Sequence, residues 1–382
     1  MQVLSLTTVS VLLLAACREP EATAPPDTDD AFRIGVQGPL SGGQQEVGLG
    51  MLRGVELAVE ELNARGGILR RQVTVVPLDD EADPDRGRQL AEEEAADLDA
   101  VVGPYNSGVG LEVLPLYVEA GLVPMRLTTA DETAGYGFTL QPMTSQIAPV
   151  ATEAVADWLE ATSVAIIFDD TQAYTVTTAR EMAEQLAAAG VTVVAQEPIA
   201  PGAEDYRDAV DAALTSEPDV VYVVAYYTEA GLVAQAMQAA ATPSLCFADW
   251  GAYDNGFLGV AGTAAQDCPV LGWPAPDAFP GSEEFLERFR ARFDAEPGSM
   301  LPYTYDATLL LASAIENAGT TDAEAVTEAL LAVDGWQGWT GTMTFEEGTG
   351  NRLPPPVTVN RADSGGTFRV DESWAAATGF RF

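Results

Sequence analysis

The segment from residue 101 to residue 108 combines residue types that suit the binding of an anion. Two valines indicate the end of a buried strand, Gly103-Pro104 indicates a turn, and the apolar spacing beyond Ser107 indicates a helix. The N-terminus of that helix would present free N–H groups and a positive dipole end beside the Ser107 hydroxyl, which suits a carboxylate. An ordinary strand–helix loop with a capping serine explains the same residues, so the turn alone leaves both interpretations open.

The composition excludes several kinds of catalytic and metal site. All 18 basic residues of the 382-residue chain are arginines, which excludes a histidine triad, a Schiff-base or P-loop lysine and a histidine-ligated zinc. The 58 acidic residues give a formal charge of -40, which disfavours nucleic acid and anionic membranes as partners. We expect no catalytic residue, metal or cofactor. The acidic excess is typical of proteins that stay soluble in high salt, and it is equally compatible with a compositional bias shared by the proteins of one lineage.

Residues 1–17 have the layout of an export signal. The apolar run at 9–14 is too short to span a bilayer, and small residues precede Cys17, as in the bacterial lipobox. This predicts a lipoprotein anchored through Cys17, followed by a flexible tether at 18–31 that is rich in Pro, Glu, Asp and Thr. Because the first ten residues contain no Arg or Lys, an unusual secretory signal with an incidental cysteine remains the alternative.

Two further cysteines, Cys246 and Cys268, remain in the body of the chain. In an exported protein, one leftover pair favours a disulfide. Two buried thiols are the alternative.

Strand-like apolar runs alternate with helical patterns along most of the chain. Strands are predicted at 32–36, 73–78, 101–102, 122–127, 164–168, 191–194, 220–224 and 244–247. Helices are predicted at 49–63, from Asp83-Pro84 onward, and at 148–159, 177–189, 206–214, 229–240, 283–293, 305–318 and 323–331. A β stretch at 341–359 is expected to end the fold. Two such series predict an α/β protein of two parallel-sheet lobes, with a ligand cleft beyond the carboxyl ends of the strands.

The chain resembles the type I periplasmic binding proteins, most closely the leucine/isoleucine/valine-binding branch that feeds ABC importers. The resemblance covers about residues 32–359 and is carried by motifs in order: Gly38-Pro39-Leu40-Ser41-Gly42, Asn63-Ala64-Arg65-Gly66-Gly67-Ile68, Asp79-Asp80, Asp83-Pro84, Gly103-Pro104 with Ser107, Tyr174 and Tyr305-Asp306-Ala307. It implies two Rossmann-like lobes joined by a hinge of three crossovers. Lobe 1 would comprise 32–144 plus 272–345, and lobe 2 would comprise 145–271 plus 346–382.

The resemblance also implies residues for an amino-acid carboxylate. Ser107, Thr128 and Thr129 match the positions that hold it, and hydroxyl and N–H donors share such a charge well. Simple capping is the alternative for the two threonines. Tyr174 and Tyr226 follow strand ends of lobe 2 and would offer an apolar wall with a hydroxyl, and Tyr105 of the turn completes this candidate set. A surface or hinge position is the alternative for the tyrosines.

Two departures from the family pattern concern the rest of the ligand. The acidic residue that pairs with a ligand's ammonium aligns with either Asp249 or Trp250, and a tryptophan there would leave at most a cation–π contact. Arg126 stands where a buried sheet calls for an apolar residue. We expect either a salt bridge to an acidic side chain or an anionic ligand for it, with the salt bridge favoured.

These observations predict an exported, membrane-anchored and monomeric solute-binding protein of an ABC importer. Its ligand would be an amino acid, branched-chain or a related carboxylate, and its partner would be the importer's permease. Two alternatives stay open. One is a ligand-sensing receptor module for amides or other small organic acids, and the other is a carboxylate-based hydrolase using Asp169, Asp170 or Asp249.

Overall fold

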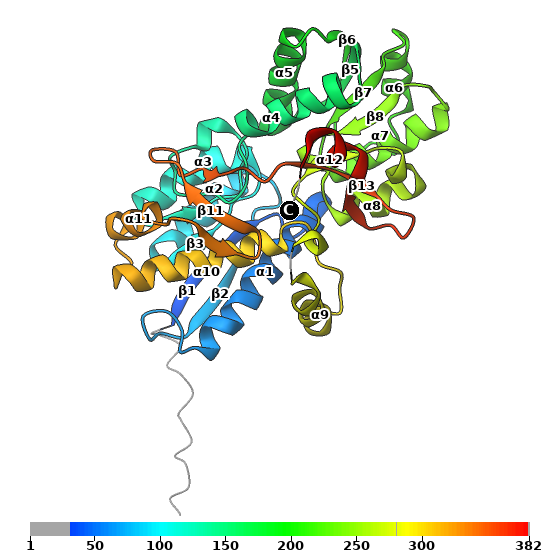
Figure 1. The fold of residues 1–382 in the computed structure, drawn as a ribbon. Coiled ribbons are helices and arrows are strands. Elements are labelled where there is room, and N and C mark those ends of the chain that lie inside the picture. Colours follow the sequence, from blue (N-terminus) through cyan, green and yellow to red (C-terminus); the bar gives the residue numbers. More distant parts are fainter. Residues whose placement is uncertain (1–30, 280, 381–382) are drawn as a thin grey trace, which may run out of the picture.

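The computed structural model describes residues 31–279 and 281–380. The predicted signal peptide, the lipidation site Cys17 and nearly all of the tether lie outside these residues. The described chain is α/β, as the sequence predicts, with two main sheets flanked by helices. Figure 1 shows the two groups of elements: the blue, cyan and orange ribbons form one, and the green and red ribbons form the other.

The first sheet is parallel and has the strand order β2-β1-β3-β4. Its strands are β1 (Phe32–Gly38), β2 (Val73–Asp79), β3 (Ala100–Val102) and β4 (Pro124–Met125). Val36 of β1 is aligned with Val102 of β3 on one side and with Pro77 of β2 on the other. A proline is tolerated there because β2 is an edge strand.

Helices connect these strands and cover the sheet. They are α1 (Gln45–Ala64), α2 (Pro84–Glu94) and α3 (Ser107–Glu119). The carboxylate of Asp83 accepts a hydrogen bond from the Arg86 N–H at 2.8 Å, and Pro84 occupies the first turn, so α2 begins where the sequence predicts. α10 (Leu301–Ala318) packs along α1, and α11 (Ala323–Leu331) packs on α10.

The second sheet has seven strands in the order β14-β13-β9-β8-β7-β5-β6. Their bounds are β5 (Ser163–Asp169), β6 (Thr192–Ile199), β7 (Val220–Val224), β8 (Leu245–Ala248), β9 (Val270–Gly272), β13 (Thr358–Ala362) and β14 (Phe368–Val370). The associated helices are α4 (Thr144–Glu153), α5 (Ala173–Ala188), α6 (Arg207–Leu214), α7 (Tyr227–Ala240), α8 (Asn255–Ala261) and α12 (Glu372–Thr378), and α9 (Ser282–Phe293) follows β9. The interior strand β7 is apolar and buried throughout, and β5 is so over most of its length, as expected of a sheet covered on both faces.

The chain passes between the two sheets after β4, after β9 and again before β13. Before the last passage it forms a small antiparallel sheet of β10 (Trp336–Gly338), β11 (Gly341–Phe345) and β12 (Arg352–Leu353). Because β12 pairs with β11 and Asn351 bridges to Thr139, residues 346–353 lie beside the first sheet, whereas the sequence assigned them to lobe 2. We propose that the last crossover comprises residues 354–357.

The C-terminal part corrects the predicted end of the fold. The chain does not end its folded part at residue 359: β13 continues to Ala362, forms an antiparallel pair with β14, and is followed by α12. The fourth strand is also shorter than predicted, because only Pro124 and Met125 are paired as a strand. None of the described helices is both long and apolar enough to cross a membrane. Within the same residues, no group of three or more His, Cys, Asp or Glu side chains could hold a metal ion.

Candidate ligand-binding site between the lobes

The turn after β3 is held tightly against its neighbours. Gly103 has a φ of +108°, and a Cβ at this position would lie 2.1 Å from the Gln37 carbonyl oxygen, so only glycine fits. The Gly103 N–H donates to the Met125 carbonyl at 2.9 Å, and the Leu127 N–H donates to the Pro104 carbonyl at 3.0 Å. The turn and the segment after β4 therefore form one continuous hydrogen-bonded unit.

Ser107 is the first residue of α3 and is 2% exposed. Its hydroxyl accepts a hydrogen bond from the Ala130 N–H at 3.2 Å, which joins the N-terminus of α3 to the loop after β4. Gly108 lies next to the second lobe, because a Cβ placed on it would be 3.8 Å from the Ala173 methyl group at the start of α5. The first turn of α3, which begins with Ser107, therefore lies next to the second lobe at Gly108.

The two candidate threonines are buried in the loop after β4. The Thr128 hydroxyl shares a hydrogen bond with the Thr133 hydroxyl at 2.7 Å, and Thr133 also donates to the Ala130 carbonyl. The Thr129 carbonyl accepts from both the N–H and the hydroxyl of Thr144. These bonds shape the loop beside Ser107, and the Thr128 hydroxyl takes part in that internal network.

Three candidate tyrosines meet where the lobes face each other. Tyr174 lies in the first turn of α5 and Tyr226 immediately precedes α7, so both stand at the carboxyl ends of strands in the second sheet. The ring centroids of Tyr174 and Tyr226 are 5.6 Å apart, and Tyr105 of the first lobe is 6.1 Å from Tyr226. All three side chains are buried.

Asp249 is fully buried and both of its carboxylate oxygens are occupied. The Tyr174 hydroxyl donates to one oxygen and the Tyr222 hydroxyl to the other. Burial raises the pKa of the Asp249 carboxyl, and the two tyrosine bonds act in the opposite direction. The next residue, Trp250, packs edge-on against Trp273 with centroids 4.9 Å apart.

Asn106, which the sequence analysis did not single out, joins the two lobes. Its side-chain nitrogen donates to the Tyr226 hydroxyl at 3.0 Å and to the Gln44 side-chain oxygen at 2.9 Å. A second contact between the lobes is the bond from the Thr228 hydroxyl to the Gly43 carbonyl at 3.3 Å. An asparagine before a helix is ordinarily interpreted as a cap, so only its place beside Ser107 signalled this role.

Arg126 is fully buried, but its partners differ from the expected carboxylate. One terminal guanidinium nitrogen donates to the Thr349 carbonyl and to the Asn351 side-chain oxygen, both at 2.7 Å, and the other terminal nitrogen contacts the Met143 sulfur at 3.4 Å. Burial lowers the pKa of Arg126 to about 9, and the nearby Asp131 opposes that shift. Neutral oxygens therefore replace the salt bridge that the sequence analysis favoured, and they tie β4 to the segment before the last crossover.

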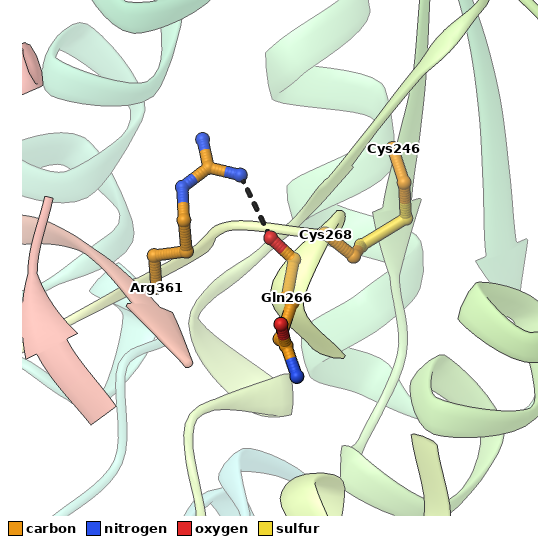
Figure 2. Close-up of a disulfide and its surroundings, with 4 residues drawn as sticks. All are labelled: Cys246, Gln266, Cys268 and Arg361. Atoms are coloured by element: carbon orange, nitrogen blue, oxygen red, sulfur yellow. Dashed lines mark hydrogen bonds between the residues drawn. A yellow bond between two sulfur atoms is a disulfide. The ribbon is translucent and has the colours of Figure 1, made fainter. Parts of the chain in front are cut away.

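The second lobe carries a disulfide between Cys246 in β8 and Cys268 just before β9 (Figure 2). The two residues are 22 positions apart. Nearby, the Arg361 guanidinium of β13 donates to the Gln266 carbonyl at 3.0 Å. The disulfide and this hydrogen bond therefore fix the end of the segment between β8 and β9, the segment that begins with Asp249 and Trp250.

Known proteins resemble this chain over most of its length. The family model for periplasmic binding proteins matches residues 31–367. The Leu/Ile/Val-binding protein BraC3 of Rhizobium johnstonii is 30% identical over 305 residues, which cover 78% of this chain and 82% of that protein. The chain therefore shares its family with BraC3.

Solved structures show the same fold. The leucine-binding protein LivK of Thermotoga maritima has a TM-score of 0.81 at 21% identity and covers 89% of this chain and 98% of its own. LivJ of Streptococcus pneumoniae, solved in complex with isoleucine, has a TM-score of 0.79 at 22% identity over 89% of this chain and 99% of its own. The chain belongs to the periplasmic binding protein family, in the branch of the Leu/Ile/Val-binding proteins.

Proposed function

We propose that this protein binds an amino acid, branched-chain or a closely related carboxylate, between its two lobes and delivers it to an ABC importer. The family is one of solute-binding proteins, and the relative BraC3 is named for Leu, Ile and Val. The structural neighbour LivJ was solved with isoleucine. These similarities support the ligand class, and the geometry of the turn supports the way in which it is held.

One observation carries the proposal: Ser107 stands at the N-terminus of α3, on the surface that faces the second lobe. A 13-residue helix presents unpaired N–H groups and the positive end of its dipole there. The Ser107 hydroxyl, which accepts from the Ala130 N–H and keeps its own proton, and the Thr129 hydroxyl would add donors around the same point. Such a set suits a carboxylate, because several neutral donors share its charge.

The rest of the ligand would lie against the aromatic side chains. Tyr105, Tyr174 and Tyr226 supply large apolar surfaces with polar tips, which suit a small ligand that is apolar at one end. Trp250 would bound this wall beside Asp249. In this proposal Arg126 does not touch the ligand. Its bonds to Thr349 and Asn351 instead hold the start of the loop that contains Thr128 and Thr129.

The proposal includes the protein's location and partners. Export, lipidation at Cys17 and a tether at 18–31 would hold the protein at the membrane as a monomer, within reach of the importer's permease. Two lobes joined by three crossovers are suited to hinge closure around a ligand. No reaction is required of the site, so we propose that the protein is not an enzyme.

A thermal-shift series tests this function. Leucine, isoleucine and valine are added to the purified protein at saturating concentrations, with glucose as a solute that lacks a carboxylate. Binding to the folded state raises the melting temperature by mass action, by an amount that grows with ligand concentration. A rise with at least one of the three amino acids and none with glucose is expected. An unchanged melting temperature with all three amino acids would contradict the proposal.

A further inference from the structure

Asn106 occupies the N-cap position of α3 but does not cap the helix. Asparagine is favoured at N-caps because its side-chain oxygen accepts a hydrogen bond from the second or third N–H of the helix. Here the side chain makes no such bond. Its nitrogen instead extends between the lobes to Gln44 and Tyr226.

The side-chain oxygen of Asn106 has no hydrogen-bond partner, although the residue is only 1% exposed. A buried acceptor without a donor is costly, and most such atoms in folded proteins are paired. The nitrogen of the same amide is fixed by bonds to the Tyr226 hydroxyl and to Gln44, so the oxygen is held in the interface between the lobes. The Asn106 side-chain oxygen can thus accept a hydrogen bond from an N–H group.

The surroundings favour a donor that is positively charged. The buried carboxylates of Asp80 and Asp169 lie close enough to the Tyr226 hydroxyl to raise its pKa together with burial. Each of these carboxylates also retains one oxygen that has no partner. These two acidic groups act on the same tyrosine hydroxyl that accepts from the Asn106 amide, so they favour a positively charged donor beside Asn106.

Asp249 is poorly placed to meet a ligand's amino group. Both of its oxygens already accept hydrogen bonds from Tyr174 and Tyr222. The neighbouring Trp250 has no acceptor atom and packs on Trp273. A partner for the amino group is therefore needed elsewhere.

We propose that Asn106 binds the amino group of the ligand through its side-chain oxygen, next to the carboxylate held at Ser107. In an α-amino acid the two groups are attached to one carbon, so adjacent residues at a helix N-terminus are spaced to hold both. This inference rests on the proposed function. It adds a specificity determinant, because a carboxylate without an amino group would leave the Asn106 oxygen unpaired.

The test compares leucine with 4-methylpentanoate, which has the same carbon skeleton and carboxylate but no amino group. Isothermal titration measures both affinities for the wild type, Asn106→Leu and Asn106→Asp. We expect the wild type to prefer leucine by about 10- to 100-fold, the range of one hydrogen bond to a charged group. Asn106→Leu should reduce this preference to within about threefold, whereas Asn106→Asp keeps an acceptor and should retain it.

Gln44→Leu is the matched control. It removes the other partner of the Asn106 amide but leaves the side-chain oxygen in place, so the preference for leucine should survive. If Asn106→Leu weakens both ligands equally, Asn106 only bridges the lobes and the inference is wrong while the proposed function stands. Equal wild-type affinities for leucine and 4-methylpentanoate would also overturn it. If neither ligand binds the wild type, the proposed function and the inference both fail.

Discussion

The Tyr174 hydroxyl donates a hydrogen bond to the Asp249 carboxylate and thereby joins the first turn of α5 to the loop after β8. The same hydroxyl accepts from the Gly251 N–H at 2.9 Å. Glycine is required at position 251, because a Cβ there would lie 2.8 Å from the Tyr174 ring. The Tyr174 side chain is therefore held in place by hydrogen bonds within the second lobe.

Tyr174→Phe should lower the stability of the protein. The variant keeps the ring but leaves one buried oxygen of Asp249 and the Gly251 N–H without their partner. A loss of about 1–3 kcal/mol in the free energy of unfolding is expected, measured by urea denaturation. Tyr136→Phe, at an exposed tyrosine, is the control and should change little. Equal stabilities for the two variants would show that the Tyr174 hydroxyl is dispensable.

Asp80→Asn should stabilise the protein in a pH-dependent way. Burial raises the pKa of Asp80 to about 7, with Asp79 and Asp83 adding to the shift. Well below pH 4 the carboxyl is protonated in both the folded and the unfolded state. Between about pH 4 and pH 7 the unfolded state loses this proton while the folded state keeps it, so stability falls, and the fall levels off above pH 7 where the folded state also ionises.

The asparagine carries no proton to lose and can still accept from the Ala82 N–H, which lies 3.0 Å from the Asp80 carboxylate. Its advantage over the wild type should grow from less than about 1 kcal/mol at pH 4 to as much as about 4 kcal/mol at pH 8. Urea unfolding at pH 4, 6 and 8 measures it, with the exposed Asp170→Asn as control. A difference between Asp80→Asn and the wild type that does not change with pH would refute this assignment.

Removal of the disulfide should destabilise the second lobe. Cys246 and Cys268 close a loop with a sequence separation of 22, for which the chain-entropy model gives about 3 kcal/mol. The variant with both cysteines replaced by alanine should lose about this much free energy of unfolding. In a Cys17→Ser background, the unreduced denatured protein should show no titratable thiol, and two thiols per chain would disprove the bridge.

Much of the fold follows from the sequence because strong local signals agree with the packing. Apolar runs predicted β5 and β7, and Asp83-Pro84 marked the start of α2. The β13–β14 hairpin was missed because its strands are short and polar at the turn, and only pairing with β9 makes them part of the sheet. Local pattern does not encode such long-range pairing.

Part of the candidate site could also be predicted from the sequence. Ser107, Tyr174 and Tyr226 stand at strand ends, where topology alone brings residues together. The partners of Arg126 were not predictable, because Thr349 and Asn351 lie more than 220 positions away in the chain. The sequence analysis did not single out Asn106, because an asparagine before a helix ordinarily caps that helix. In the structure its side chain makes no capping bond.

The central claim, that a ligand carboxylate is held at Ser107 between the lobes, is tested most directly by isothermal titration of isoleucine into the wild type and Ser107→Ala. Thr263→Ala, at an exposed threonine, serves as the control. The account predicts one site per chain in the wild type and an unchanged affinity in the control. Ser107→Ala should bind more weakly by about 1–3 kcal/mol, or roughly 5- to 150-fold. An equal affinity for isoleucine in the wild type and Ser107→Ala would contradict it.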